Sequence, residues 1–272
     1  MNQLTKPIRI EKMQTDAFVD YQDFSGKRIL IGLSGGINSA AVICFLATEY
    51  PKEYLPDEIH LFYAHFDDHS PDTMKFVEDC IKYAEDNFKK IVVEITYNSM
   101  REFCTTQKMI PHPTNSACSR IMKREPIMKY YEQHDLDFDL VGYVREEKNR
   151  VTRQQSYNNA QSKNKIYPIT TLSDRDCEII CEKEIGWIPE IYSHKDANGK
   201  RIFKHNNCLP CKNMHGREMK LVKEYYPDYY DNALSLAKDL AEQLDKPIHW
   251  GRKDEGDDEL INLHVCTTCD WD

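Results

Sequence analysis

The chain has 272 residues, of which 40% are hydrophobic and 30% are charged, and its formal net charge is -9. This length and composition suffice for one large globular domain, or for a domain with a small appendage, and they exclude a disordered chain. No apolar run reaches the length of a transmembrane helix, and the N-terminal segment lacks the apolar stretch of a signal peptide, so we expect a cytoplasmic protein with no membrane partner. The negative charge excludes a general attraction to nucleic acid, which would bind only through a local patch. We expect nucleic acid, if it is a partner, only as the acceptor in a reaction.

Apolar runs typical of strands alternate with helical patterns through the first half of the chain. In chain order, we expect a strand at 27–33, a helix at 40–49, a strand at 58–66, an amphipathic helix at 72–88, and strands at 91–97 and 139–144. This alternation predicts an α/β fold with a doubly wound parallel sheet and crossover helices. Ligands of such sheets bind beyond the carboxyl ends of the strands.

The second half of the chain has a different pattern. Residues 151–165 are polar and almost free of apolar side chains, which predicts a loop. From Tyr167 onward, short helical patterns alternate with loops that carry cysteines, and an acidic stretch at 253–259 is typical of a hydrophilic linker. We therefore expect a smaller helical region after the sheet.

A turn of small residues joins the first predicted strand to the first helix. It consists of Ser34, Gly35, Gly36, Ile37, Asn38 and Ser39. Two glycines let the backbone approach a polyphosphate, the two serines add hydroxyl donors, and the free N–H groups at the helix start favour an anion. The turn therefore indicates a phosphate cradle, and an ordinary Ser/Gly turn remains the alternative.

This hexapeptide resembles the Ser-Gly-Gly-x-Asp-Ser signature of the PP-loop superfamily, the adenine nucleotide alpha-hydrolase-like proteins. It is not a Walker A loop, because no lysine lies inside the turn. The resemblance implies a Rossmann-like fold that binds an adenine nucleotide. Asn38 occupies the place of the usual aspartate and lacks the charge that favours Mg²⁺, so a magnesium site is left open.

Further along the chain, a second block resembles the phosphoadenylyl sulfate (PAPS) reductase branch of that superfamily. Cys118, Lys123 and Pro126 are followed by a strand that ends at Gly142, then by Arg145 and Arg150. Lys123, Arg145 and Arg150 are suited to neutralising phosphate or sulfate, although solvated surface charges are the alternative. Asp67, at the end of the second predicted strand, is a further candidate. Together with Gly142 and these three cations, it completes the expected set of nucleotide-binding residues.

Ten cysteines in a chain without an export signal indicate reduced thiols, metal ligation or redox chemistry. Cys208 with Cys211 forms one short-spaced pair, and Cys266 with Cys269 forms another, which suits zinc or an iron–sulfur cluster. The resemblance implies that Cys118 joins Cys208 and Cys211. Candidates for a fourth ligand are His215, Cys104 or the terminal pair, whereas Cys44, Cys80, Cys177 and Cys181 are expected to be buried helix residues.

The terminal cysteines have a competing interpretation. PAPS reductases carry a nucleophilic cysteine near a flexible C-terminus, which implies that Cys266 and Cys269 attack the sulfur of a bound sulfonucleotide. The Glu-Cys-Gly tail of those enzymes is absent here.

We therefore predict a PP-loop adenine-nucleotide-binding domain at 1–165 and a cysteine-containing region at 166–272. The resemblance implies an enzyme of sulfur metabolism that acts on ATP or PAPS, either as an adenylating sulfurtransferase or as a sulfonucleotide reductase. Asn38, Cys266 and Cys269 are its candidate catalytic residues, and a sulfur donor or a thiol-reductant protein is its expected partner. A regulatory module that binds the nucleotide without catalysis is the alternative, and the sequence predicts no oligomeric state.

Overall fold

The computed structural model describes residues 21–112, 116–155, 164–214, 216–246, 248 and 250. At its centre is a five-stranded parallel sheet with the strand order β3-β2-β1-β4-β5. The strands are β1 (Arg28–Leu33), β2 (Glu58–Phe66), β3 (Ile91–Asn98), β4 (Phe138–Leu140) and β5 (Lys165–Ile166). The chain starts in the middle of the sheet, runs outward to β3 and returns to the other side, which confirms the doubly wound α/β prediction.

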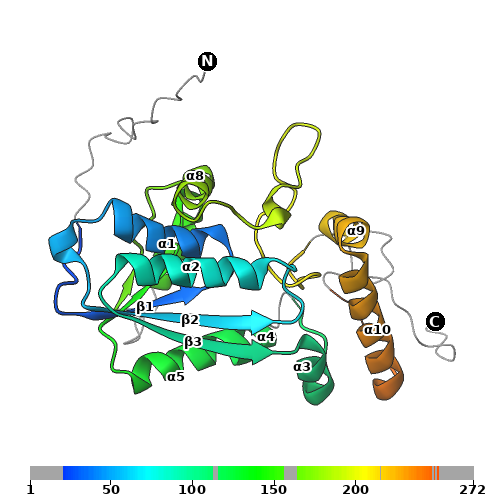
Figure 1. The fold of residues 1–272 in the computed structure, drawn as a ribbon. Coiled ribbons are helices and arrows are strands. Elements are labelled where there is room, and N and C mark those ends of the chain that lie inside the picture. Colours follow the sequence, from blue (N-terminus) through cyan, green and yellow to red (C-terminus); the bar gives the residue numbers. More distant parts are fainter. Residues whose placement is uncertain are drawn as a thin grey trace.

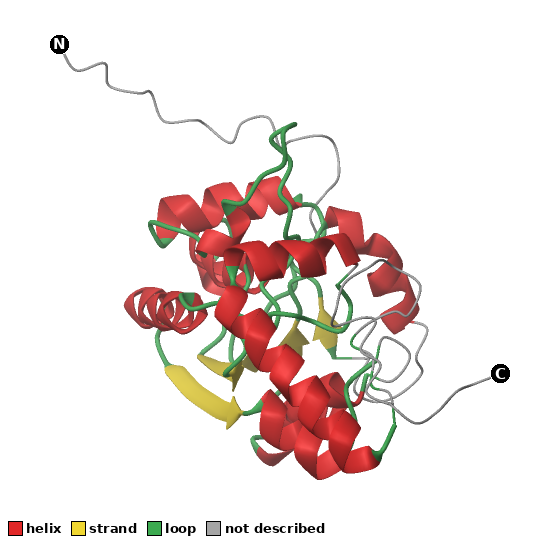
Figure 2. Ribbon diagram, turned by 90° about the vertical axis from the view of Figure 1, so that its right-hand side faces the viewer, coloured by secondary structure: helices red, strands yellow, loops and turns green. Residues whose placement is uncertain are grey.

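Helices cover both faces of the sheet, as Figures 1 and 2 show. In Figure 1, α1, α2 and α8 lie on one face, and α5 lies on the other. The helices are α1 (Ile37–Thr48), α2 (Thr73–Asn87), α3 (Met100–Gln107), α4 (Ala117–Ser119), α5 (Glu125–Gln133), α6 (Lys148–Gln155), α8 (Asp174–Glu184), α9 (Gly216–Tyr225) and α10 (Pro227–Leu244). Short helical turns complete the list: η1 (Lys52–Tyr54), the π-helical η2 (Arg120–Arg124), η3 (Arg145–Glu147) and η4 (Glu190–Tyr192). All strands point toward α9 and α10, so loops at the carboxyl ends of the strands face these helices.

Two predictions for the middle of the chain had the wrong bounds. The strand expected at 139–144 is only β4, because the chain turns away after Leu140 and brings Gly142 against the start of α1. The loop expected at 151–165 contains the end of α6 and the start of β5. A helix made of polar residues has no apolar period, and a two-residue strand has no alternation, so neither gives a sequence signal.

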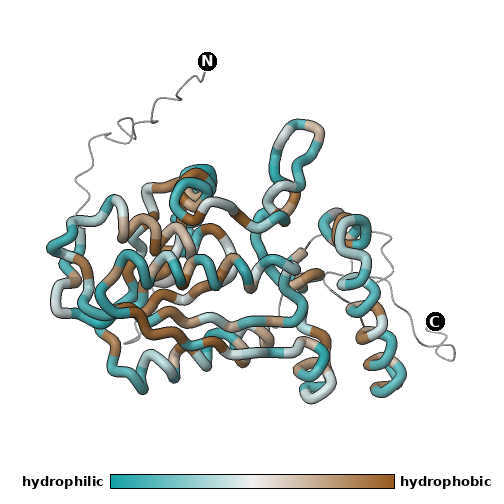
Figure 3. Tube along the Cα trace, viewed as in Figure 1, coloured by the Kyte–Doolittle hydropathy of each residue, from teal (hydrophilic) through white to brown (hydrophobic). Residues whose placement is uncertain are grey.

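The hydrophobic core lies between the sheet and its helices. Figure 3 shows that hydrophobic residues are concentrated along the strands in the middle of the molecule. The largest fully buried side chains include Tyr63 and Phe66 of β2 and Phe76 of α2. Cys44, Cys80, Cys177 and Cys181 are all buried in α1, α2 and α8, as predicted.

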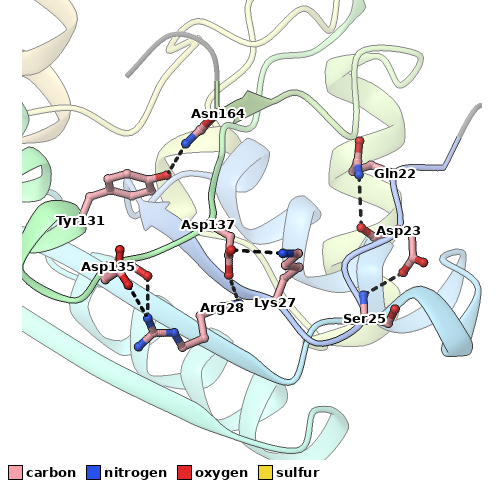
Figure 4. A network of polar contacts seen from close by, with 9 residues as sticks. All are labelled: Gln22, Asp23, Ser25, Lys27, Arg28, Tyr131, Asp135, Asp137 and Asn164. Atoms are coloured by element: carbon pink, nitrogen blue, oxygen red, sulfur yellow. Dashed lines mark hydrogen bonds and ion pairs between the residues drawn. The ribbon is translucent and has the colours of Figure 1, made fainter. Parts of the chain in front are cut away.

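A polar network fixes the start of β1 against β4 at the end of the sheet away from the strand tips (Figure 4). The carboxylate of Asp137 accepts the backbone N–H of Arg28 over 2.8 Å and pairs with Lys27 over 3.4 Å. The N–H of Asp137 also donates to the carbonyl of Arg28 over 2.8 Å. These bonds set the register of the strands whose tips carry the candidate site. None of the described helices is long and apolar enough to cross a membrane.

Candidate functional site

The turn between β1 and α1 has a shape that only glycine allows at Gly35. This residue has a φ of +76°, in the left-handed region, and a Cβ there would lie 2.4 Å from Cγ2 of Thr73. A side chain would be strained by the backbone angle and would also overlap α2. The turn is therefore held tightly against the start of α2.

Hydrogen bonds within the turn involve both serines that were predicted to bind phosphate. The hydroxyl of Ser39 accepts the N–H of Ser34 and donates to the carbonyl of Gly36, each over 3.0 Å. The N–H of Gly36 donates to the hydroxyl of Ser34 over 3.3 Å. Ser39 is buried and shapes the turn, whereas Ser34 is exposed at its rim.

The segment after β4 lies against the same turn. A Cβ at Gly142 would be 2.5 Å from the carbonyl oxygen of Asn38, so a larger residue would push the two segments apart. The side-chain N–H of Asn38 donates to the carboxylate of Asp174 over 3.1 Å, while its Oδ1 is buried and has no hydrogen-bond partner among the described residues. The carboxylate missing from position 38 is thus present next to it, on α8.

A cavity of about 990 Å³ opens above these segments. Seven predicted site residues line it: Ser34, Gly36, Asn38, Ser39, Lys123, Gly142 and Arg150. They come from three parts of the sequence that the parallel sheet brings to one edge, as expected for a doubly wound fold. A cavity of this size is at the upper end of the range typical of ligand pockets.

Two predicted cations are held on aromatic rings in this cavity. The Lys123 ammonium lies 4.6 Å from the centre of the Phe66 ring, and the Arg150 guanidinium lies 4.4 Å from that of Tyr143. Arg150 also pairs with Glu147. An aromatic face orients a cation without neutralising it, which leaves the positive charge of Lys123 available to an anion, whereas Arg150 shares its charge with Glu147.

Arg145 and Asp67 do not line this cavity. The side chain of Arg145 is 56% exposed and lies 3.8 Å from the carboxylate of Asp176. Asp67 accepts the N–H of Met100 at the start of α3 over 3.2 Å and lines a second cavity of about 370 Å³. The nucleotide-binding roles of Arg145 and Asp67 remain predictions.

The second cavity contains a carboxyl group with a strongly altered acidity. Burial, with the adjacent charge of Asp67, raises the pKa of Asp68 to about 7. The backbone carbonyl of Asp68 accepts the N–H of Leu209 over 2.8 Å, which ties the end of β2 to the loop of the first cysteine pair.

Cys208 and Cys211 lie in this loop, directly after residues that line the large cavity. Burial raises the pKa values of both thiols, and the positive charge of Lys123 opposes that effect. Cys118 is buried in α4 and is one of the groups that affect the pKa of Cys208.

The described residues contain no group of three or more His, Cys, Asp or Glu side chains that could hold a metal ion. The zinc or iron–sulfur site predicted at Cys118, Cys208 and Cys211 is therefore not assembled among the described residues, and it stays a prediction. Cys104, another candidate ligand, is fully buried, and its pKa is raised to about 12 by burial. His215, Cys266 and Cys269 lie outside the described residues.

Sequence reasoning missed the part of the cavity wall formed by the segment from η4 to the cysteine loop. Its cavity-lining residues include Tyr192, Lys200, Arg201, Lys204, His205 and Asn206. The basic run in this segment could have indicated an anion-binding site from the sequence alone. Nothing in the sequence around Tyr192 or Asn206 marks either residue as part of a site.

Comparisons with known proteins identify the family that the sequence matches. The family described as the phosphoadenosine phosphosulfate reductase domain matches residues 28–193. No curated protein matches the sequence.

Several solved structures are similar to the chain. The U34-tRNA thiolase NcsA from Methanococcus maripaludis, with its [4Fe-4S] cluster, is 13% identical, with a TM-score of 0.44 over 82% of this chain and 74% of its own. PAPS reductase from Candida auris, in a phosphate complex, is 15% identical, with a TM-score of 0.39 over 66% of this chain and 80% of its own. NMN synthetase from Francisella tularensis is 16% identical, with a TM-score of 0.39 over 64% of this chain and 68% of its own.

Proposed function

The chain belongs to the phosphoadenosine phosphosulfate reductase domain family, and from this membership we propose that it is an enzyme that binds ATP or PAPS and performs sulfur chemistry. The observation that carries the proposal is the shared cavity. It joins the turn after β1 to Lys123 and Arg150, and its wall continues directly into the loop of Cys208 and Cys211.

The phosphates would bind at the turn and the start of α1. Backbone N–H groups at a helix start and a left-handed glycine favour a phosphate. Lys123 and Arg150, which line the same cavity, would add positive charge. Arg145 is retained as a proposed nucleotide-binding residue that would reach the ligand from outside the lining.

Two reactions fit this arrangement. As an adenylating sulfurtransferase, the enzyme would use ATP to activate an acceptor, which then receives sulfur; as a sulfonucleotide reductase, it would release sulfite from PAPS with a thiol reductant. Asn38, Cys266 and Cys269 are the proposed catalytic residues. A binding module without catalysis is the second candidate, and it is favoured by Asn38, whose amide hydrogen-bonds to Asp174.

Calorimetric titration with ATP, AMP, adenylyl sulfate and PAPS tests the proposed ligand. Turnover separates the candidates, because the sulfurtransferase releases AMP and pyrophosphate from ATP, the reductase releases sulfite from PAPS in the presence of a thiol, and the binding module does neither. A protein that binds none of these nucleotides would contradict the proposal.

Paired arginine variants test the assignment within the site. We expect Arg150→Ala to weaken nucleotide binding about tenfold, because a charge-assisted hydrogen bond to phosphate is lost. Arg145→Ala is also expected to weaken binding, and unchanged affinity would remove Arg145 from the site. The surface variant Arg120→Ala loses a comparable exposed ion pair, with Glu125, and serves as the control.

Metal analysis tests the cysteine assignment independently. Zinc would indicate a structural site, and iron with acid-labile sulfide would indicate a cluster. Cys208→Ser should lose the bound metal in either case, whereas Cys80→Ser, at a buried helix position, should retain it.

A further inference from the structure

Two residues beyond the turn complete its wall through buried hydrogen bonds. Tyr192, in η4, is 3% exposed, and Asn206, just before the cysteine loop, is 5% exposed. Both line the large cavity together with Gly36. A Cβ at Gly36 would lie 2.9 Å from the hydroxyl oxygen of Tyr192, so this hydroxyl lies directly against the turn.

Toward the described residues, the hydroxyl of Tyr192 acts only as an acceptor. It accepts the N–H of Ile37, the first residue of α1, over 3.4 Å, and the N–H of Asn206 over 3.1 Å. A phenol has one hydrogen to donate, and neither backbone N–H is able to accept it. Among the described residues, no acceptor for the Tyr192 hydroxyl hydrogen is found.

Asn206 holds this arrangement in place from the other side. Its side-chain N–H group donates to the carbonyl of Gly35 over 2.8 Å and to the hydroxyl of Thr73 over 2.9 Å. Its side-chain oxygen accepts from the hydroxyl of Ser70 over 3.1 Å. Every polar group of the Asn206 side chain is thus used, and its backbone N–H fixes the Tyr192 oxygen.

We propose that Tyr192 is a phosphate-binding residue, which donates its hydroxyl hydrogen to an anionic phosphate oxygen in the turn, and that Asn206 is the positioning residue that aims this hydroxyl. The proposal deepens the proposed function and rests on it, because the anion is the phosphate of the bound nucleotide. The start of α1 offers only backbone N–H groups to a phosphate, and the N–H of Ile37 already donates to Tyr192. The hydroxyl of Tyr192 would supply one further donor at this position.

The acidity of Tyr192 agrees with this role. Burial raises the pKa of its hydroxyl to about 12. The group therefore keeps its hydrogen throughout the neutral range and acts as a donor. The guanidinium of Arg201, 5.2 Å from the centre of the Tyr192 ring, packs on its face and is paired with Glu178 over 3.0 Å, which holds the ring in place.

The test compares Tyr192→Phe with the wild type by calorimetric titration with ATP, with adenosine and with inorganic pyrophosphate. The variant keeps the ring and loses one hydrogen bond to a charged oxygen, so we expect ATP and pyrophosphate to bind about ten- to hundredfold more weakly. Adenosine binding should be unchanged, because adenosine carries no phosphate. A purely structural role would weaken all three ligands or none.

Tyr50→Phe is the matched control. Tyr50 is a buried tyrosine at the far end of α1, whose hydroxyl donates to the carbonyl of Gln22 over 2.7 Å, so the variant loses a hydroxyl hydrogen bond away from the cavity. Its affinity for all three ligands should equal that of the wild type. Circular dichroism of both variants monitors folding. Asn206→Asp provides a second test variant, because it places an oxygen against the Gly35 carbonyl. We expect it to show the same loss of pyrophosphate binding.

The outcomes separate the two proposals. Unchanged or tighter ATP and pyrophosphate binding by Tyr192→Phe overturns the role of Tyr192, since tighter binding would mean that its hydroxyl only competes for the Ile37 N–H. Wild-type protein that binds pyrophosphate but no nucleotide contradicts the proposed function, while the pyrophosphate comparison still decides the role of Tyr192. Wild-type protein that binds neither ligand overturns both.

Discussion

The side-chain amide of Asn206 donates to the backbone carbonyl of Gly35 over 2.8 Å, across 171 residues of the chain. This bond ties the cysteine-bearing part of the molecule to the turn after β1. It also orients the peptide between Gly35 and Gly36, whose N–H in turn donates to Ser34. The shape of the turn is therefore set jointly by its own sequence and by a segment 171 residues further along the chain.

Replacing Asn206 tests how much stability this buried network supplies. We expect Asn206→Ala to lower the free energy of unfolding by about 2 kcal/mol, because the Gly35 carbonyl and the Ser70 hydroxyl lose a buried partner. Urea unfolding measures the change. Asn87→Ala is the control, since exposed Asn87 donates to the carbonyl of Tyr83 in its own helix. If Asn206→Ala costs no more than this control, the network is not a source of stability.

The left-handed glycine of the turn gives a second prediction. Gly35→Ala combines strain at a φ of +76° with a Cβ 2.4 Å from Thr73, and we expect a loss of about 3 kcal/mol in stability. In the control Gly26→Ala, the residue has a φ of +71° and nothing lies within 4 Å of the added Cβ, so only the backbone angle causes strain. We expect this variant to lose about 1 kcal/mol in stability. Equal losses in thermal or urea unfolding would show that the contact with Thr73 has no effect.

The pairing of Asn38 with Asp174 predicts what restoring the usual aspartate would do. In Asn38→Asp, two carboxylates face each other at the site of the present 3.1 Å hydrogen bond. Like charges at this distance raise the pKa of one carboxyl, so the variant should be about 1–3 kcal/mol less stable than the wild type at pH 7 and should recover as the pH falls toward 4.

Exchanging the two side chains provides the control. Adding Asp174→Asn to Asn38→Asp restores one amide and one carboxylate, and we expect the double variant to regain wild-type stability at pH 7. Unfolding of all four proteins in a double-mutant cycle measures the coupling. A coupling energy near zero would mean that the Asn38–Asp174 bond is not formed in solution.

The sequence was sufficient for the parts of the structure whose cause is local. The strand predicted at 58–66 has the bounds of β2, because a long apolar run between turn residues leaves little choice of ends. The turn after β1 was identified for the same reason, since its glycines and serines are adjacent in the chain. Tyr192 and Asn206 could not be identified in this way, because they meet Ile37 and Gly35 across 155 and 171 residues.

The carboxyl of Asp68 predicts how the stability of the protein depends on pH. Its pKa rises from 3.8 to about 7, mainly because burial penalises the charged form, with a further contribution from the charge of Asp67. The folded state therefore binds a proton that the unfolded state releases above about pH 4, so this stabilising contribution is complete below pH 4 and is lost as the pH rises through 7.

We expect Asp68→Asn, which keeps the shape and removes the charge, to be up to about 4 kcal/mol more stable than the wild type at pH 8 and similar to it at pH 4. Urea unfolding between pH 4 and 8 measures the difference, with Asp57→Asn, whose side chain is 56% exposed, as the surface control. A constant offset between wild type and Asp68→Asn across this range would show that the carboxyl titrates as it does in water.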